Sequence, residues 1–221
     1  MESPVEQRIQ ITFGKFGALK YTGNLDVAKI WERVLRRARL PILYTKGFNT
    51  RPRIQLATAL PLGITSECEI LDVALREKLL SFQSLPEQLM AVAPAGLRVF
   101  HVEEVPPKSP ALQALVRRAT YRIHFEDGIA RERLQQAVDE ILSKERIVKV
   151  HVRRNGRKSS ADIRPLIYSL RVDEQNDLIA HIGAGERGNL QPADLLAEMG
   201  ISDEYTTTHR FELIMDQYIR R

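Results

Sequence analysis

The sequence predicts a mixed α+β protein made of two similar halves, each an antiparallel sheet with helices. Three observations lead to this prediction. The pattern Asn or Asp, any residue, Arg, Pro, any residue, Ile occurs at residues 49–54 and again at 162–167. Strand-like and helix-like periods of apolar residues follow one another in the same order around both copies. Residues 105–110 contain three prolines, which continue neither a strand nor a helix and mark a seam between the halves.

The first half begins with residues 8–13, where polar and apolar side chains alternate as they do in a half-buried strand. Apolar residues then recur every three or four positions from Leu25 to Ala38, which predicts an amphipathic helix with Asn24 as its N-cap. The remaining elements expected in this half are strands at 53–60 and 69–75 around a turn at 61–63, a helix at 84–93 and a closing strand at 97–105.

The second half repeats this order. Residues 120–125 alternate like a strand, and an apolar stripe from Leu134 to Leu142 predicts a helix. Further elements are expected as strands at 166–172 and 177–182, a helix at 192–199 that stops at Gly200, and a strand at 206–215. The order β-α-β-β-α-β is that of the ferredoxin-like unit and of RNA-recognition modules. We therefore expect two tandem ferredoxin-like halves, with the boundaries 1–105 for the first half, 106–118 for a proline-rich linker and 119–221 for the second half.

Composition excludes several classes of protein. The 221 residues are 43% hydrophobic and 28% charged, which are ordinary globular values and not those of collagen, a coiled coil or a disordered chain. Cys68 is the one cysteine, so the sequence builds neither a disulfide framework nor an iron–sulfur cluster with three or four cysteine ligands. The start resembles no secretory signal, and no apolar run approaches the ~18–20 residues of a membrane helix. We expect a cytoplasmic protein with no membrane contact, no cofactor and no metal ion.

The net charge of +5 conceals two basic stretches. Residues 15–53 hold ten Lys or Arg and two acids, a net of +8, and residues 144–171 hold nine and two, a net of +7. The rest of the chain is therefore acidic. Clustered cations create a local positive field that attracts polyanions, although basic residues can also simply keep an exposed surface soluble. The residues that we expect to bind an anion are Lys46, Asn49, Arg51, Arg53, Arg154, Arg157, Lys158, Asp162 and Arg164.

Several of these stretches resemble a radical-SAM-linked family of uncharacterised bacterial proteins, whose members are encoded beside, or fused to, a radical S-adenosylmethionine protein. The sequence departs from the family pattern at Asn24, where a histidine is common, and at Thr50, where a proline is common. The resemblance implies a radical SAM protein as partner, in a setting concerned with RNA. The stretches that carry it are residues 13–17, 24–26, 31–38, 40–41, 46–54, 59–63, 71–73 and 162–165.

These observations favour a non-catalytic accessory protein that presents an anionic substrate, tRNA or rRNA, to a radical SAM enzyme. Paired ferredoxin-like halves also resemble the catalytic core of tRNA pseudouridine synthases, but the loop at 44–53 contains Asn49 and lacks the aspartate that those enzymes need. The alternative from the enzyme class is an RNA-modifying or RNA-cleaving enzyme on the same scaffold, with Asp26 or Asp162 as the reacting group. In a third interpretation, the basic stretches dock onto an acidic protein.

Overall fold

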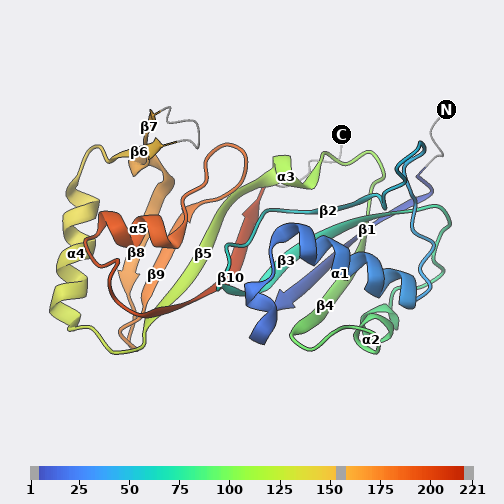
Figure 1. The fold of residues 1–221 in the computed structure, drawn as a ribbon, viewed down its shortest axis with the longest axis horizontal. Coiled ribbons are helices and arrows are strands. Elements are labelled where there is room, and N and C mark those ends of the chain that lie inside the picture. The colour runs from blue at the N-terminus through green and yellow to red at the C-terminus, as the bar shows by residue number, and fades with distance from the viewer. Residues whose placement is uncertain (1–4, 153–157, 217–221) are drawn as a thin grey trace. The chain divides into compact units, whose positions relative to one another are not determined.

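The computed structural model describes residues 5–152 and 158–216, and the chain divides into two compact units. Unit 1 holds residues 5–116 with 215 and 216, and unit 2 holds residues 117–214. Both units combine helices with antiparallel strand pairs, so the predicted mixed α+β class with a mostly antiparallel sheet is confirmed. Figure 1 shows the elements of both units.

Unit 1 is built on the strand order β4-β1-β3-β2, and each neighbouring pair is antiparallel. Its elements are β1 (Gln7–Lys15), the 3-10 helix η1 (Gly17–Tyr21), α1 (Asn24–Arg37), β2 (Ile54–Leu56), β3 (Thr65–Leu75), α2 (Leu85–Met90), β4 (Leu97–Val105) and α3 (Leu112–Leu115).

The core of unit 1 lies between its sheet and α1, which crosses one face of the sheet (Figure 1). Alternation in β1 buries Ile9, Ile11 and Phe13 on that face. Trp31 of α1 is fully buried and meets the Phe13 ring edge-on, with ring centroids 4.9 Å apart. The buried stripe of this helix consists of Val27, Trp31, Val34 and Leu35, and the basic residues of α1 lie on the solvent side. Leu25, the first residue of the predicted stripe, is instead 78% exposed.

Three elements of unit 1 differ from the prediction. The helix α1 begins at Asn24, and Gly23 is its N-cap, because the Gly23 carbonyl accepts from the first turn. The strand expected at 53–60 is only β2, three residues long. The turn at 61–63 folds back onto η1, where Gly63 N donates to Lys20 O, and this draws the chain out of the sheet. The helix expected at 84–93 is shortened to α2.

The segment expected as a linker, 106–118, contains α3 and the first residues of β5 (Val116–Phe125). Side chains of unit 1 hold its proline-rich part. Arg8 donates to the carbonyls of Ser109 and Pro110, and Leu112 N donates to the side chain of Gln55. Strand β4 therefore ends at the prolines, but the segment that follows remains hydrogen-bonded to unit 1.

Unit 2 has the strand order β10-β5-β9-β8 and a separate two-stranded sheet of β6 and β7. The apolar side of β5, with Tyr121, Ile123 and Phe125, is buried, and α4 packs against β8. The elements that follow β5 are α4 (Arg131–Ser143), β6 (Val148–Val152), β7 (Lys158–Asp162), the 3-10 helix η2 (Arg164–Leu166), β8 (Ile167–Val172), β9 (Leu178–Gly183), α5 (Pro192–Glu198) and β10 (Thr206–Met215).

Within the residues that the structure describes, no helix is both long enough and apolar enough to span a membrane.

Candidate nucleic-acid interface

Residues 44–53 of unit 1 form a closed loop, here named the Arg-Pro loop. Tyr44 and Pro52 pair as an isolated antiparallel bridge at its base. Thr45 N donates to Arg51 O at 2.8 Å, and Arg51 N donates to Thr45 Oγ1 at 2.9 Å, which closes the tip. Because the base and the tip are both tied by hydrogen bonds, the side chains between Thr45 and Arg51 project from a defined turn.

The tip of the Arg-Pro loop combines cations with an exposed aromatic ring. Three of the residues that the sequence predicted to bind an anion are exposed at this tip: Lys46, Asn49 and Arg51. Phe48 stands between them with a relative exposure of 107%. Leaving a phenylalanine in water forgoes about 1.5–3 kcal/mol of burial free energy. Gly47 precedes it with φ at 126°, a backbone conformation that favours glycine and turns the ring outward.

Sequence reasoning selected the polar residues of this tip and missed Phe48. The signal was present, because an aromatic residue between Gly47 and Asn49 interrupts the most basic stretch of the chain. Exposed aromatic rings among cations are typical of surfaces that bind single-stranded nucleic acid, where bases stack on the ring and cations meet phosphates.

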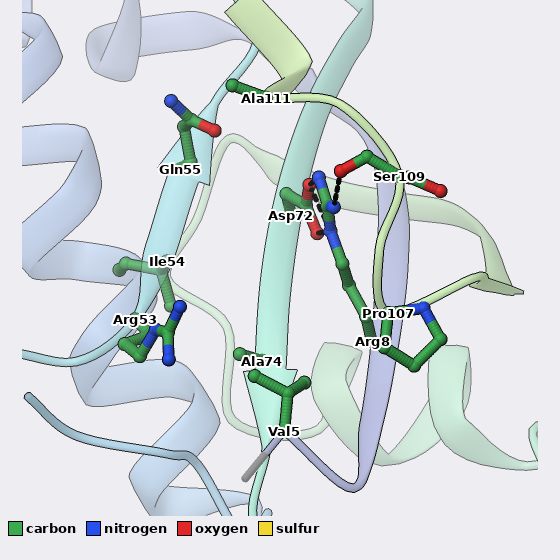
Figure 2. Close-up of a pocket in the computed structure, with 10 residues that line it drawn as sticks. All are labelled: Val5, Arg8, Arg53, Ile54, Gln55, Asp72, Ala74, Pro107, Ser109 and Ala111. Atoms are coloured by element: carbon green, nitrogen blue, oxygen red, sulfur yellow. Dashed lines mark hydrogen bonds and ion pairs between the residues drawn. The ribbon is translucent and has the colours of Figure 1, made fainter. Parts of the chain in front are cut away.

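Arg53 lies at the base of the loop and lines a pocket of about 420 Å³. Figure 2 shows Arg53, just before β2, and Ile54 and Gln55 of β2 along one side of this pocket, with Arg8 and Asp72 on neighbouring strands opposite. The volume is in the range of small-molecule sites, and the lining is mixed polar and apolar. The predicted anion-binding residue Arg53 therefore stands where the loop meets a concave surface.

The opposite wall of the pocket is a buried ion pair. Arg8 Nε lies 2.8 Å from both carboxylate oxygens of Asp72, and Nη2 also contacts Oδ2 (Figure 2). The side chains are 12% and 5% exposed. The remaining Arg8 donors reach Ser109 O at 2.5 Å and Pro110 O at 2.9 Å. These contacts engage the Arg8 guanidinium in building the wall.

In unit 2 the second Arg-Pro pair has a different role. Arg164 clamps the end of α4, with Nη2 donating to Leu142 O at 3.1 Å and Nε donating to Lys144 O at 2.9 Å. Its Nη1 donates to Ile167 O at 3.2 Å. The last carbonyls of a helix lack partners within the helix, and a guanidinium satisfies them while complementing the negative end of the helix dipole. Each guanidinium nitrogen of Arg164 therefore donates to a main-chain carbonyl oxygen.

Asp162, which the sequence analysis placed among the anion-binding residues, accepts hydrogen bonds from backbone N–H groups of unit 2. Its Oδ1 accepts from the backbone N–H groups of Ile147 and Arg164, each at 3.0 Å. The Ile147 N–H is the largest cause that holds the pKa of the Asp162 carboxyl below its usual range, assisted by the Arg164 N–H and the charges of Arg146 and Arg164. A carboxylate stabilised in this way stays ionised at neutral pH. It ties Ile147, just before β6, to the start of η2, which connects β7 to β8.

The other predicted residues are placed as follows. Lys158 is the first residue of β7 and pairs with Val152, whereas Arg154 and Arg157 lie outside the described residues. Asp26 is exposed in the first turn of α1, with Oδ1 3.3 Å from Lys29 Nζ. In the described parts of the chain, no three His, Cys, Asp or Glu side chains gather as metal ligands. The Arg-Pro loop belongs to unit 1 and Arg164 to unit 2.

Comparison with known proteins gives one strong match. A family model described as "Uncharacterized protein conserved in bacteria (DUF2344)" matches residues 8–192. None of the curated proteins compared with this chain matches it.

Two solved structures are similar at low identity. One chain, from the crystal structure of a Cbf5-Nop10-Gar1 complex, is 12% identical with a TM-score of 0.48, and the match covers 95% of this chain and 51% of that one. This chain therefore spans about half the length of that relative. The second is "Crystal structure of putative glycine cleavage system transcriptional repressor", 11% identical with a TM-score of 0.28, covering 95% and 98% of the two chains. Both likenesses are too weak to assign a fold or a function here.

Proposed function

We propose that this chain, which belongs to the DUF2344 family of uncharacterized conserved bacterial proteins, is a non-catalytic accessory protein that binds RNA. In this proposal it acts in the cytoplasm and presents a structured RNA, tRNA or rRNA, to a radical SAM enzyme. The observation that carries the proposal is the tip of the Arg-Pro loop, where the fully exposed Phe48 lies between Lys46 and Arg51.

The chemistry of this tip suits RNA. Unpaired bases stack on aromatic rings, and a guanidinium grips a phosphate through two parallel hydrogen bonds. Lys46 and Arg51 supply positive charge on either side of the ring, and the Asn49 amide can both donate to and accept from a base edge. Arg53 extends the cationic surface from the tip to the pocket in Figure 2. We leave Arg164 out of the proposed RNA surface because main-chain oxygens engage its guanidinium.

We further propose that the two units are ferredoxin-like repeats of one ancestral element, in a pseudouridine-synthase-like duplication. The sheet of unit 1 has the order β4-β1-β3-β2 and that of unit 2 the order β10-β5-β9-β8. If β6 and β7 are set aside as an insertion and the four remaining strands of each unit are numbered along the chain, both sheets have the order 4-1-3-2. The two copies of the Arg-Pro pattern support this proposal. Each ends on the first residue of the edge strand, Ile54 of β2 and Ile167 of β8.

A radical SAM protein is the proposed partner because the sequence resembles the radical-SAM-linked family. The residues of this chain include one cysteine, so the cluster that starts radical chemistry would belong to the partner. In this proposal, the partner carries out the reaction and this protein positions the RNA. Co-purification of the two proteins from cells that express both tests the pairing, and persistence after nuclease treatment would separate a protein contact from a contact through RNA.

The test of RNA binding is a titration of fluorescent tRNA and rRNA fragments at several salt concentrations. We expect affinity to fall as salt rises, because phosphate contacts release counterions. Phe48→Ala should weaken binding about 5- to 150-fold, the range of one lost stacking contact of ~1–3 kcal/mol. Arg51→Ala should weaken binding and reduce the salt slope by about one.

Matched controls come from exposed residues of unit 1. Leu80 is as exposed as Phe48, and Arg76 is an exposed arginine, so Leu80→Ala and Arg76→Ala should bind as the parent does. The proposal fails if RNA does not bind at low salt, if affinity ignores salt, or if the controls lose as much affinity as the loop variants.

A further inference from the structure

The solvent-facing side of the unit 2 sheet carries an array of arginine and aromatic side chains. Strand β5 alternates, so that its apolar residues point to the core and Arg118, Thr120 and Arg122 point to the other side. Register places His181 of β9 opposite Thr120, and Ser169 of β8 opposite His181. Three neighbouring strands thus place polar side chains at the same level of one face. Thr120 is buried among them, and its hydroxyl donates to Glu212 Oε2 of β10 at 2.6 Å.

The centre of the array is the ring of Tyr168, which contacts two neighbouring side chains. The guanidinium carbon of Arg118 lies 3.9 Å from the centroid of the Tyr168 ring. The rings of Tyr168 and His181 have centroids 5.5 Å apart and planes inclined by 43°. Tyr168 remains 44% exposed, so much of this residue is open to solvent.

His181 contributes a neutral ring. Burial lowers its pKa, and the charge of Arg118 lowers it further, against a small opposing effect of Glu212. Imidazole therefore stays uncharged at neutral pH and does not repel Arg118. Its Nε2 is shielded from solvent and meets no hydrogen-bond partner among the described residues.

A second arginine–aromatic pair lies on the same strand. Arg122 lies 5.7 Å from the Phe211 ring centroid of β10. Arg118 and Arg122 are four residues apart on β5, a distance of ~13 Å along a strand. Arg122 also lies 3.8 Å from carboxylate oxygens of both Asp173 and Asp177, so this second pair is closer to neutral than the first.

We propose that this face of unit 2 is a stacking platform for the bases of single-stranded RNA, with Tyr168 as its main stacking surface and Arg118 as its cationic contact. The inference rests on the proposed function and specifies which form of RNA this unit binds. Base faces are available for stacking only where the strand is unpaired, so a double helix would not use the platform. Aromatic rings with arginine planes beside them on an open sheet form the arrangement that holds such strands.

The experiment measures the anisotropy of a labelled oligouridylate of about ten nucleotides, within the site sizes of single-strand-binding folds, against the full chain. Tyr168→Ala should weaken binding roughly tenfold, whereas Tyr168→Phe keeps the ring and should restore it. Arg118→Ala should weaken binding and lower the salt dependence. The matched control is Tyr205→Ala, because Tyr205 is a more exposed tyrosine of the same unit, at 67%.

Outcomes separate this inference from the proposed function. If Phe48→Ala and Arg51→Ala weaken tRNA binding but Tyr168→Ala binds the oligouridylate like the parent, the platform is wrong and the accessory role stands. If the oligouridylate binds through Tyr168 while structured RNA does not bind, the platform stands and the accessory role falls. A duplex of equal length bound as tightly as the single strand, or an equal loss in Tyr205→Ala, overturns the platform. Circular dichroism of each variant confirms that it is folded.

Discussion

Arg8 and Asp72 form a bidentate ion pair in unit 1, with Arg8 Nε at 2.8 Å from both carboxylate oxygens. The two residues are 64 positions apart in sequence and meet because β1 pairs with β3. Since the pair is nearly closed to solvent, removing one partner would leave the other charge buried.

The first prediction follows from that burial. Arg8→Met should lower the free energy of unfolding by ~3–5 kcal/mol, because the Asp72 carboxylate is left uncompensated. The double variant Arg8→Met with Asp72→Leu should lose less than the single one. Urea denaturation measures both. Arg76→Met is the control, since that arginine pairs with Glu77 in an exposed setting and should change stability by less than ~1 kcal/mol. A double variant that is no more stable than the single one would contradict this account.

The second prediction concerns the clamp on α4. Arg164→Lys keeps the charge but cannot reach three carbonyls in fixed directions, so unit 2 should lose ~1–3 kcal/mol of stability. Hydrogen exchange should speed up at the end of α4 and in η2. Arg171→Lys, at an exposed position of β8, serves as the control. RNA binding by the Arg-Pro loop should be unchanged, and a selective loss of RNA affinity in a fully stable Arg164→Lys would show that the clamp is not its main role.

The third prediction is a pH dependence of unit 2. His124 Nδ1 lies 2.7 Å from Asp177 Oδ1, and this hydrogen bond is the main cause that raises the pKa of His124 above 6.5. A raised folded-state pKa adds stability that is fully present below the unfolded pKa and is lost as pH rises through the folded value. Replacing His124 by Gln should therefore matter most at mildly acidic pH and least at alkaline pH. Measuring stability across that range checks the sign.

His181 should titrate in the opposite sense. Burial lowers its pKa, so its contribution to stability is present above 6.5 and is lost as pH falls through the lower folded value. Titration of the two imidazoles by NMR should place His124 above 6.5 and His181 below it. The reverse order would refute the structural assignment of both rings.

The fourth prediction tests a backbone position. Arg39 follows α1 with φ at 57°, a left-handed conformation that costs most residues free energy. Leu40 N donates to Leu35 O at 3.1 Å across this turn, as in helices that end on glycine. Arg39→Gly should raise stability by ~0.5–1 kcal/mol, whereas Arg36→Gly inside the helix should lower it by about 1 kcal/mol. Thermal unfolding of both variants distinguishes them, and a destabilised Arg39→Gly would show that the arginine side chain makes a contact worth more than the strain.

Local patterns predicted the elements whose residues alternate or recur without interruption. The strands expected at 97–105 and 206–215 are β4 and β10 with the same bounds. The helix expected after Asn24 is α1, which begins one residue earlier, and its stripe buries Trp31. Elements whose limits depend on distant partners were predicted less well. Strand β2 ends early because the following turn is held by η1 through the hydrogen bond from Gly63 N to Lys20 O. Local sequence patterns do not predict this contact.

The candidate site divides in the same way. Clustering of Lys46, Asn49 and Arg51 is visible in the sequence because they are neighbours in one loop. Phe48 lies in the same stretch but was not selected, since an apolar residue in a sequence is normally expected inside. The clamp formed by Arg164 was also hidden, because its acceptors lie at the end of a helix about twenty residues earlier.

The sequence alone determined the α+β class, the two basic stretches and the relative order of the elements that it predicted, because periodicity and composition are properties of contiguous residues. It did not predict α3, β6 or β7. Tertiary structure alone decided which arginine is committed to the main chain, which one lines a pocket and which one stacks on Tyr168. The physical reason is that a long charged side chain reaches several ångströms beyond its own backbone. Its partner is therefore set by strand register and helix packing between segments far apart in the chain.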